Sequence, residues 1–273
     1  MAELEYIRPD STLNRRFVAP GAEMNTGRYE RHRVHIRDAR RNEEPLTLDR
    51  CGFELIHHES AVTDFRDPAN LTDHYLPEIA GLVQRMTGAD KVIAFSALVR
   101  DVDNPTAGTQ PAGTDVHTDY TPRRGLHLAR SQLARIGESD FPFRRFEAIN
   151  LWRALSPGPQ NMPLAVCDAL SVGHDEGVAN TMIRVAELPA PDEIARPLSD
   201  EEQLLEASLF SFRPEHRWFY YPDMRADELL VFRLHDSRET GPWRTPHAAF
   251  LDTSRTNPVP RVSVEARTVA YFR

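Results

Sequence analysis

Hydrophobic positions along the chain change from helical to strand-like spacing. In residues 70–87 they recur at the spacing of one helix face, and Gly88 follows as a stop signal. Residues 123–136 repeat that spacing. The pattern therefore predicts two helices, near residues 70–87 and 123–136.

Short strand-like stretches dominate the chain from residue 146 onward. The predicted strands cover residues 51–58, 92–99, 146–151, 164–170, 180–185, 207–212, 218–221, 228–234, 247–251 and 261–272. Proline and glycine separate them, and no internal repeat is visible. Helices followed by many short strands predict a mainly β fold, an antiparallel jelly roll with helical support.

The first 45 residues are charged and poorly periodic, with one possible strand at residues 33–36. We expect residues 1–45 to form an arm that wraps around a jelly-roll core made of residues 46–273. All-β barrels and sandwiches reach this length as one domain, so a single domain of 273 residues is expected.

Composition narrows the class of protein. Hydrophobic residues make up 40% of the chain and the mean hydropathy is −0.51, values typical of a globular protein in water. No apolar run reaches membrane-spanning length and the first residues lack a signal sequence, so we expect a cytoplasmic protein without a membrane partner. The net charge of −8 argues against nucleic-acid binding. Composition says nothing of oligomeric state.

Several catalytic classes lack their residues. Cys51 and Cys167 are the only cysteines and form no CxxC motif, which argues against a disulfide framework or a thiolate zinc site. Lys91 is the only lysine, so Schiff-base chemistry is improbable. Glycine motifs for dinucleotides, phosphate loops and a nucleophile elbow are absent from the sequence.

Three residues far apart in the sequence suggest a metal site. His117 and Asp119 form a His-x-Asp motif, and His247 follows much later on a strand-like stretch. Two imidazoles and one carboxylate are the facial ligands of non-haem Fe(II), which leave other positions open. Two rival motifs, at residues 57–59 and 174–176, show that His-x-Asp or His-x-Glu alone carries little weight.

The strand predicted at 261–272 carries a second chemical signal. Its alternation places Arg261, Ser263, Glu265 and Arg267 on one face. An arginine and a serine two residues apart suit a dianionic co-substrate such as 2-oxoglutarate, because a guanidinium grips a carboxylate with two bonds. The alternatives are a charged, solvent-facing strand edge, or Glu265 as the internal partner of the arginine.

Several stretches resemble the AsaB-like group of non-haem oxygenases, of the CmcJ and NvfI type. These are VHTDYT (116–121), NLWRAL (150–155), PLAVCD (163–168), WFYYPDM (218–224), DS (236–237), PHAAF (246–250) and RVSVEAR (261–267). The resemblance spans roughly residues 53 to 267. It implies a double-stranded β-helix (cupin-like jelly roll) enzyme that uses Fe(II) and 2-oxoglutarate. It also implies that His117, Asp119 and His247 hold the metal, and that Arg261 and Ser263 bind the co-substrate.

Other residues are candidates for the pocket. Asn150 and Trp152 share one strand face and could reach the co-substrate, while Arg153 points the other way and has a structural role. Arg267 is either a second handle for the anion or a partner of Glu265.

Four further residues are candidates for contact with substrate: Tyr120, Thr121, Tyr221 and His127. The first two follow the metal motif directly, and His127 lies on the helix that comes next. For each of them a purely structural role is the alternative.

These features predict an oxygenase that acts on a small molecule in natural-product biosynthesis. It would oxidise an unactivated C–H bond by hydroxylation, desaturation or ring formation, while 2-oxoglutarate and O2 become succinate and CO2. Two alternatives remain open: a zinc-dependent hydrolase that uses the same ligands, and a jelly-roll binding protein without catalysis.

Overall fold

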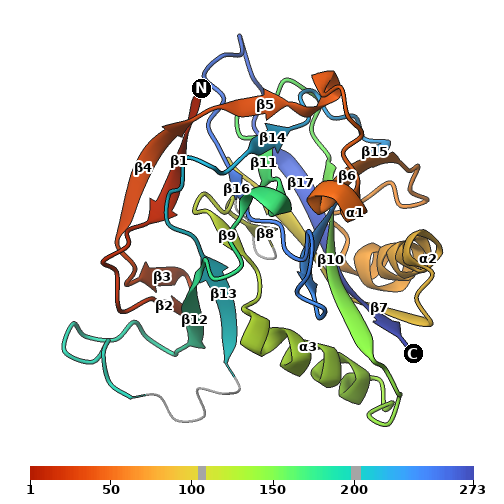
Figure 1. Cartoon of the computed structure of the whole chain (residues 1–273), viewed down its shortest axis with the longest axis horizontal. Coiled ribbons are helices and arrows are strands. Elements are labelled where there is room, and N and C mark those ends of the chain that lie inside the picture. Colours follow the sequence, from red (N-terminus) through yellow and green to blue (C-terminus); the bar gives the residue numbers. More distant parts are fainter. Residues whose placement is uncertain (104–108, 198–203) are drawn as a thin grey trace.

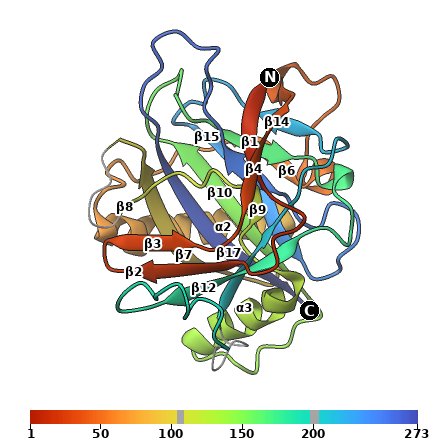
Figure 2. The same cartoon turned by 90° about the vertical axis from the view of Figure 1, so that its left-hand side faces the viewer.

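The computed structural model describes residues 1–103, 109–197 and 204–273. Two β-sheets packed face to face form its centre (Figures 1 and 2). The first sheet has the strand order β6–β15–β10–β17–β7–β8. Its strands are β6 (Phe53–His57), β7 (Lys91–Asp101), β8 (Thr109–Gln110), β10 (Arg145–Ala154), β15 (Glu228–Asp236) and β17 (Val262–Phe272).

The second sheet has nine strands in the order β3–β2–β12–β13–β9–β16–β11–β14–β5. They are β2 (Arg15–Ala19), β3 (Ala22–Asn25), β5 (Ile36–Asp38), β9 (His117–Thr118), β11 (Leu164–Cys167), β12 (Val178–Arg184), β13 (Leu205–Leu209), β14 (Trp218–Tyr220) and β16 (His247–Ala249). The two sheets confirm the predicted mainly β jelly roll, and every strand predicted from the hydrophobic pattern has a counterpart.

Side chains alternate between two environments along β17. Its residues 269 and 271 lie in the core between the two sheets, whereas residues 264, 266 and 270 pack against the helical layer outside. β10 pairs with β17 in antiparallel register, with Ala154 opposite Ser263 and Asn150 opposite Arg267. Because directly paired residues point to the same side of a sheet, these four side chains face the interior.

Two helical segments flank the sheets, as the spacing predicted. A π-helical turn (Asn70–Tyr75) continues into α2 (Leu76–Thr87), which ends at Gly88 in a left-handed conformation with φ 67°. This segment buries Tyr75, Ile79 and Val83 against the outer face of the six-stranded sheet. Helix α3 (Pro122–Arg135) packs at one end of the inter-sheet core. Shorter helical turns are η1 (Ala39–Arg41), α1 (Leu48–Cys51) and η3 (Ala169–Ser171).

The N-terminal residues are more regular than predicted. They form five strands rather than one: β1 (Ala2–Ile7), β4 (Tyr29–Val34), and β2, β3 and β5 of the nine-stranded sheet. β1 and β4 pair with each other and cover the outer face of that sheet, where Leu4 and Tyr6 pack beside Trp218 (Figure 1, left). The alternation of Leu4 and Tyr6 with glutamates was a strand signal in the sequence.

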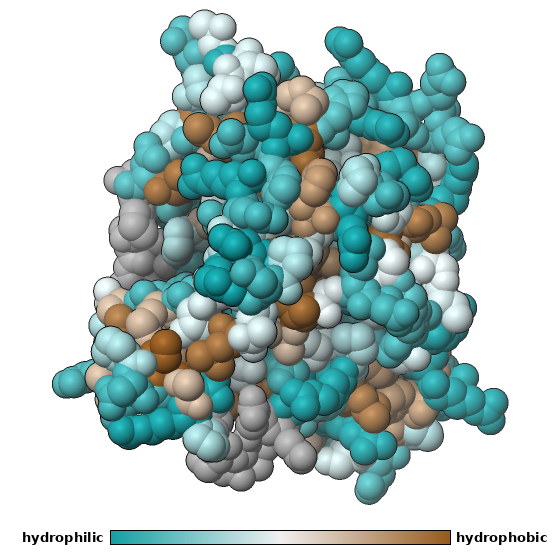
Figure 3. Space-filling view, turned by 60° about the vertical axis from the view of Figure 1, so that its left-hand side comes forward, coloured by the Kyte–Doolittle hydropathy of each residue, from teal (hydrophilic) through white to brown (hydrophobic). Residues whose placement is uncertain are grey.

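On the face shown in Figure 3 the surface is mainly hydrophilic, and hydrophobic residues form small separate groups. Among the described residues, no helix is long and apolar enough to cross a membrane.

Candidate metal centre

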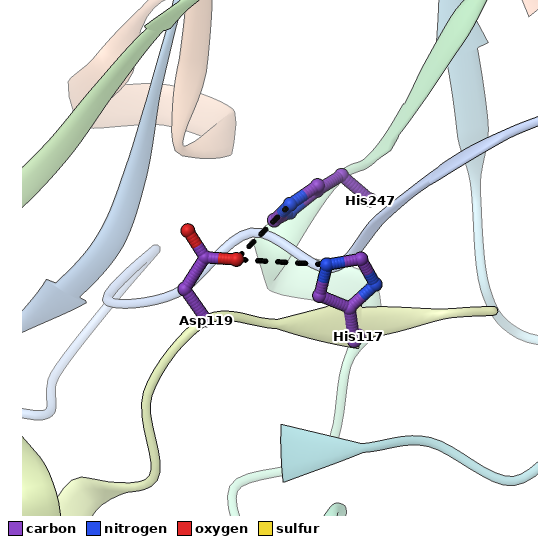
Figure 4. A group of neighbouring side chains, drawn as sticks. All are labelled: His117, Asp119 and His247. Atoms are coloured by element: carbon purple, nitrogen blue, oxygen red, sulfur yellow. Dashed lines mark ion pairs between the residues drawn. The ribbon is translucent and has the colours of Figure 1, made fainter. Parts of the chain in front are cut away.

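Three side chains meet at the inner face of the nine-stranded sheet. His117 lies on β9 and His247 opposite it on β16, while Asp119 follows β9 directly. The candidate ligand atoms of the three residues all lie within 4.8 Å of one another. Figure 4 shows that both imidazoles approach the same carboxylate oxygen of Asp119. Its Oδ1 is 3.5 Å from His117 Nε2 and 3.8 Å from His247 Nε2.

The backbone fixes the orientation of both imidazoles in the same way. His117 Nδ1 donates to the Asp115 carbonyl oxygen at 2.7 Å, and His247 Nδ1 donates to the Thr245 carbonyl oxygen at 3.1 Å. Because a carbonyl can only accept, Nδ1 carries a proton, and in the neutral imidazole, the form that binds metal, Nε2 then keeps a free lone pair. Such partners set the tautomer and ring direction of metal-binding histidines. The Phe232 ring packs on His247, with ring centroids 4.7 Å apart.

The charged groups of this cluster shift one another's pKa values. Burial disfavours ionisation of His117, but the carboxylates of Asp115 and Asp119 raise its pKa to about 9. Burial and repulsion by His117 lower the pKa of His247 to about 4. Burial also opposes ionisation of Asp119, yet the Arg267 cation and the two imidazoles hold its pKa well below the ordinary range. A divalent cation therefore finds one carboxylate and two nitrogens that already converge, which fits Fe(II).

Arg261 and its neighbours form a second, polar region of the interior. Arg261 is 1% exposed, and burial, followed by repulsion from Arg100, lowers its pKa to about 9. One Nη donates to the Met162 carbonyl oxygen at 2.8 Å and the guanidinium lies over the Trp152 ring at 5.7 Å. Within the described chain it forms no ion pair with a carboxylate.

Two buried polar atoms of this region, Arg261 Nε and Ser263 Oγ, have no hydrogen-bond partner among the described residues. Asn150 Oδ1, which lies further along β10 opposite Arg267, is also buried without such a partner. A buried cation without a counter-ion and hydroxyl and amide groups without partners are costly unless a ligand completes them. An anion with two carboxylates, such as 2-oxoglutarate, fits the Arg261 guanidinium and the Ser263 hydroxyl.

Glu265 is not the partner of Arg261. Both of its oxygens accept bonds of 3.0 Å from Arg100, and Oε1 also accepts one of 2.6 Å from Arg267. Burial raises the pKa of Glu265, but Arg100 and Arg267 outweigh this effect and lower it to about 2. The expectation of a solvent-facing strand edge is also wrong, because Arg261, Ser263 and Glu265 are buried.

Arg267 is a partner of Glu265, which is one of the two alternatives predicted for it. Besides its bond to Glu265, its Nε donates to Asp119 Oδ2 at 2.6 Å. The sequence offered Glu265 as a partner but gave no signal for the contact with Asp119. That contact depends on how the two sheets are placed against each other.

The predicted strand faces of residues 150–153 are as expected. Asn150 and Trp152 face the interior, whereas Arg153 bonds to the His58 and Ala226 carbonyl oxygens on the other side of β10. Arg153 also lines a cavity of about 690 Å³ on that outer side, together with Leu155 and Val262. None of the residues that line this cavity belongs to the metal cluster.

The four candidate substrate residues are spread over different environments. Tyr120 is buried in the core beside Asp119 and Arg267, and burial raises its pKa. Tyr221 is buried and lines a small pocket with Trp152.

Thr121 and His127 are not brought to the cluster. Thr121 caps helix α3: its Oγ1 accepts from the Arg124 amide at 3.3 Å and donates to Glu206 Oε2 at 3.0 Å. The Thr-Pro pair before the helix was a sequence signal for this cap. His127 is exposed on α3, so a substrate role for it has no structural support.

Gly113 is a site residue that sequence reasoning missed. A Cβ at this position would lie 3.1 Å from His117 Cε1, and the Gly113 carbonyl accepts from the Ala249 amide at 2.8 Å. Only a residue without a side chain leaves the His117 ring in its place without a shift. Two glycines, Gly108 and Gly113, lie in residues 103–115, and nothing in the sequence distinguished this one.

Comparison with known proteins places the chain among oxidoreductases. The family model described as "Oxidoreductase/YMDC permease-like domain" matches residues 4–271. The hydroxylase/desaturase CTB9 of Cercospora beticola is 32% identical over 260 residues, which cover 90% of this chain and 78% of CTB9. The Fe(II)/2-oxoglutarate-dependent dioxygenase nvfI of Aspergillus novofumigatus is 26% identical and aligns over 99% of this chain and 96% of its own.

A solved structure shows the same fold. The iron and alpha-ketoglutarate-dependent endoperoxidase NvfI superposes with a TM-score of 0.78 and 25% sequence identity, covering 99% of this chain and 97% of its own. The likeness extends over both sheets and both flanking helices rather than over the metal motif alone.

Proposed function

This chain belongs to the AsaB/NvfI-like family of Fe(II)/2-oxoglutarate-dependent oxygenases, and from this membership we propose that it oxidises an unactivated C–H bond of a small molecule. Relatives with this architecture are named hydroxylase/desaturase, dioxygenase and endoperoxidase. The proposed reaction is therefore hydroxylation, desaturation or ring formation in natural-product biosynthesis, with O2 as the second co-substrate.

His117 Nε2, His247 Nε2 and Asp119 Oδ1 are the proposed Fe(II) ligands. The support is their convergence within 4.8 Å and the carbonyl partners that leave both Nε2 atoms free. Arg261 and Ser263 are the proposed binders of the distal carboxylate of 2-oxoglutarate, with Trp152 beside Arg261; Asn150, opposite Arg267, is a further proposed contact. The observation that carries this assignment is a fully buried guanidinium without a carboxylate partner in the described chain.

The chain contributes binding, orientation and exclusion of water. Bound Fe(II) and 2-oxoglutarate supply the oxidising power when O2 arrives. Arg261 fixes one end of the co-substrate, and its guanidinium is held by the Met162 carbonyl and the Trp152 ring. Phe232 covers the His247 ring and keeps that side apolar. Tyr120 and Tyr221 are the candidates for substrate contact that the structure keeps in the interior.

One spectroscopic experiment tests the function against both alternatives. Fe(II) and then 2-oxoglutarate are added to the protein without oxygen, and the visible charge-transfer absorption of the chelated metal is recorded. We expect the band to appear only after both additions, and succinate to form when oxygen and a substrate are admitted. Zinc bound in stoichiometric amount with hydrolytic activity would identify a hydrolase, and metal binding without either signal would identify a binding protein.

The substrate can be sought from the product. Turnover of 2-oxoglutarate to succinate is measured across a panel of small amino-acid-derived and polyketide-derived compounds, with the product mass as the readout. A gain of one oxygen indicates hydroxylation, and a loss of two hydrogens indicates desaturation or ring closure.

The cellular location and the domain organisation of the protein are also proposals. A cytoplasmic location is supported by two free, buried thiols, Cys51 and Cys167, which are typical of reducing compartments. A single oxygenase domain is supported by the family match over residues 4–271.

A further inference from the structure

The two oxygens of the Asp119 carboxylate have different partners. Oδ1 faces the Nε2 atoms of His117 and His247, whereas Oδ2 accepts the bond of 2.6 Å from Arg267 Nε. In Figure 4 the second oxygen points away from both imidazoles. A planar guanidinium that holds one carboxylate oxygen restricts the rotation of the whole group. Asp119 is thus presented to the centre of the cluster through Oδ1 alone.

Arg267 is itself held in place by a further pair of charges. Its Nη2 donates to Glu265 Oε1 at 2.6 Å, and Arg100 grips both oxygens of Glu265 at 3.0 Å. Charges therefore alternate from Arg100 on β7 through Glu265 and Arg267 on β17 to Asp119 beside β9. The series connects the six-stranded sheet with the cluster on the nine-stranded sheet.

We propose that Arg267 is a positioning residue for Asp119, and that Glu265 acts on the metal site through Arg267. This inference rests on the proposed function, because it takes Asp119 as a metal ligand. It removes Arg267 from the co-substrate site and leaves the distal carboxylate of 2-oxoglutarate to Arg261. Outer partners that orient metal ligands are worth about 10- to 100-fold in metal affinity.

The direct test measures binding of Co(II) alone to the metal-free protein. The d–d absorption of Co(II) reports both affinity and coordination, and no turnover is needed. We expect Arg267→Met to bind Co(II) about 10- to 100-fold more weakly than the wild type, with an altered absorption spectrum. Arg267→Lys should recover only part of the loss, because an ammonium cannot hold Asp119 and Glu265 in one fixed plane.

Arg153→Met is the matched control. Arg153 is a buried arginine of the same sheet, but it bonds to carbonyl oxygens on the opposite side of β10. We expect the Arg153→Met variant to have a changed melting temperature, but to keep the Co(II) affinity and the absorption spectrum of the wild type. If Arg153→Met loses as much Co(II) affinity as Arg267→Met, the loss comes from general destabilisation of the protein. That result would overturn the proposal.

A double-mutant cycle tests the second half of the proposal. Glu265→Gln keeps the shape of the side chain but removes its charge, and should weaken Co(II) binding about 3- to 10-fold. If Glu265 acts through Arg267, the double variant should bind no more weakly than Arg267→Met alone. Additive losses would show that Glu265 reaches the metal site by another route.

The outcomes separate this inference from the proposed function. If the wild type binds no divalent metal at the cluster, the proposed function fails. If the wild type binds Co(II) and Arg267→Met binds it equally well, only the positioning role fails. A variant that keeps Co(II) affinity but loses 2-oxoglutarate affinity would make Arg267 a co-substrate residue after all.

Discussion

The two ends of the polar segment 261–267, which leads into β17, differ in how their charged side chains are paired. At the Glu265–Arg267 end of this segment, charged side chains are paired with other residues of the chain. At the Arg261–Ser263 end, a buried guanidinium has no carboxylate partner in the described chain and a buried hydroxyl has no hydrogen-bond partner there. Arg261 and Glu265 are both buried, so burial alone does not explain the difference.

The comparison separates structural charge from ligand-binding charge. A buried ion pair is costly to form, but its groups satisfy each other and stiffen the surrounding structure. A buried cation without an anion is stable only if something else supplies the negative charge. We therefore read the paired end as support for the metal cluster and the unpaired end as a co-substrate site.

The largest expected effect lies at the cluster that the paired end supports. His117→Ala, Asp119→Ala and His247→Ala should each abolish metal binding and turnover, because each removes one of the three proposed ligands. Metal content after loading with Fe(II), measured by mass spectrometry, checks this. His174→Ala is the matched control, since the His174 side chain is exposed, and this variant should bind metal normally. Full activity in a cluster variant would remove that residue from the ligand set.

The next largest effect is expected at the unpaired end. Arg261→Ala should raise the KM for 2-oxoglutarate roughly 30-fold or more, because leaving a buried carboxylate without its partner costs about 2–5 kcal/mol. Arg261→Lys should recover the loss only in part, since an ammonium lacks the two-pronged geometry. Succinate formation at varied 2-oxoglutarate provides the measurement. An unchanged KM would place the co-substrate elsewhere.

A moderate effect on stability is expected at the paired end. The folded pKa of Glu265 is about 2, below its ordinary value of 4.5. Its ionised form thus contributes stability that is complete above about pH 4.5 and is lost as the pH falls toward 2. Glu265→Gln should lower the free energy of unfolding by on the order of 1–3 kcal/mol near neutral pH.

The pH dependence of that difference is the sharper test. Urea unfolding of wild type and Glu265→Gln at several pH values should show the largest gap near pH 7 and a gap that narrows below about pH 4.5. A gap that stays constant with pH would mean that the charge of Glu265 does not contribute.

The smallest effect is expected for Ser263→Ala, and the sign of its effect on stability should depend on whether 2-oxoglutarate is bound. Ser263 Oγ is buried without a partner among the described residues, so Ser263→Ala should leave the unloaded protein equally or slightly more stable. With 2-oxoglutarate present, loss of one hydrogen bond of about 0.5–1.5 kcal/mol should weaken binding a few-fold. Thermal melting with and without the co-substrate measures both effects. Destabilisation of the unloaded protein would show that the hydroxyl has a structural partner.

Periodicity predicted the elements that are regular over many residues. The helix that ends at Gly88 and the alternating strand β17 follow from spacing that is visible in the sequence. In the first 38 residues only one strand, at residues 33–36, was predicted, because charged residues mask the short alternation of Leu4 and Tyr6. Burial under β4 and against the nine-stranded sheet makes that segment regular.

Contacts between the two sheets could not be predicted from spacing. The approach of His247 to Asp119 was anticipated from ligand chemistry and family resemblance. The bond from Arg267 to Asp119 connects residues 148 positions apart on different sheets, and depends on strand register and sheet packing. The pairing of Glu265 with Arg100 needs the same information, because Arg100 comes from the neighbouring strand β7.

The central claim is that Arg261 binds the co-substrate, whereas Arg267 positions the metal ligand Asp119. Calorimetric titration of 2-oxoglutarate into the protein at saturating Co(II) tests it in two matched variants, Arg261→Met and Arg267→Met. We predict that Arg261→Met loses roughly 30-fold or more in 2-oxoglutarate affinity, whereas Arg267→Met stays within a few-fold of the wild type once its metal site is filled. Equal losses in both variants, or a loss confined to Arg267→Met, would contradict this division of roles along β17.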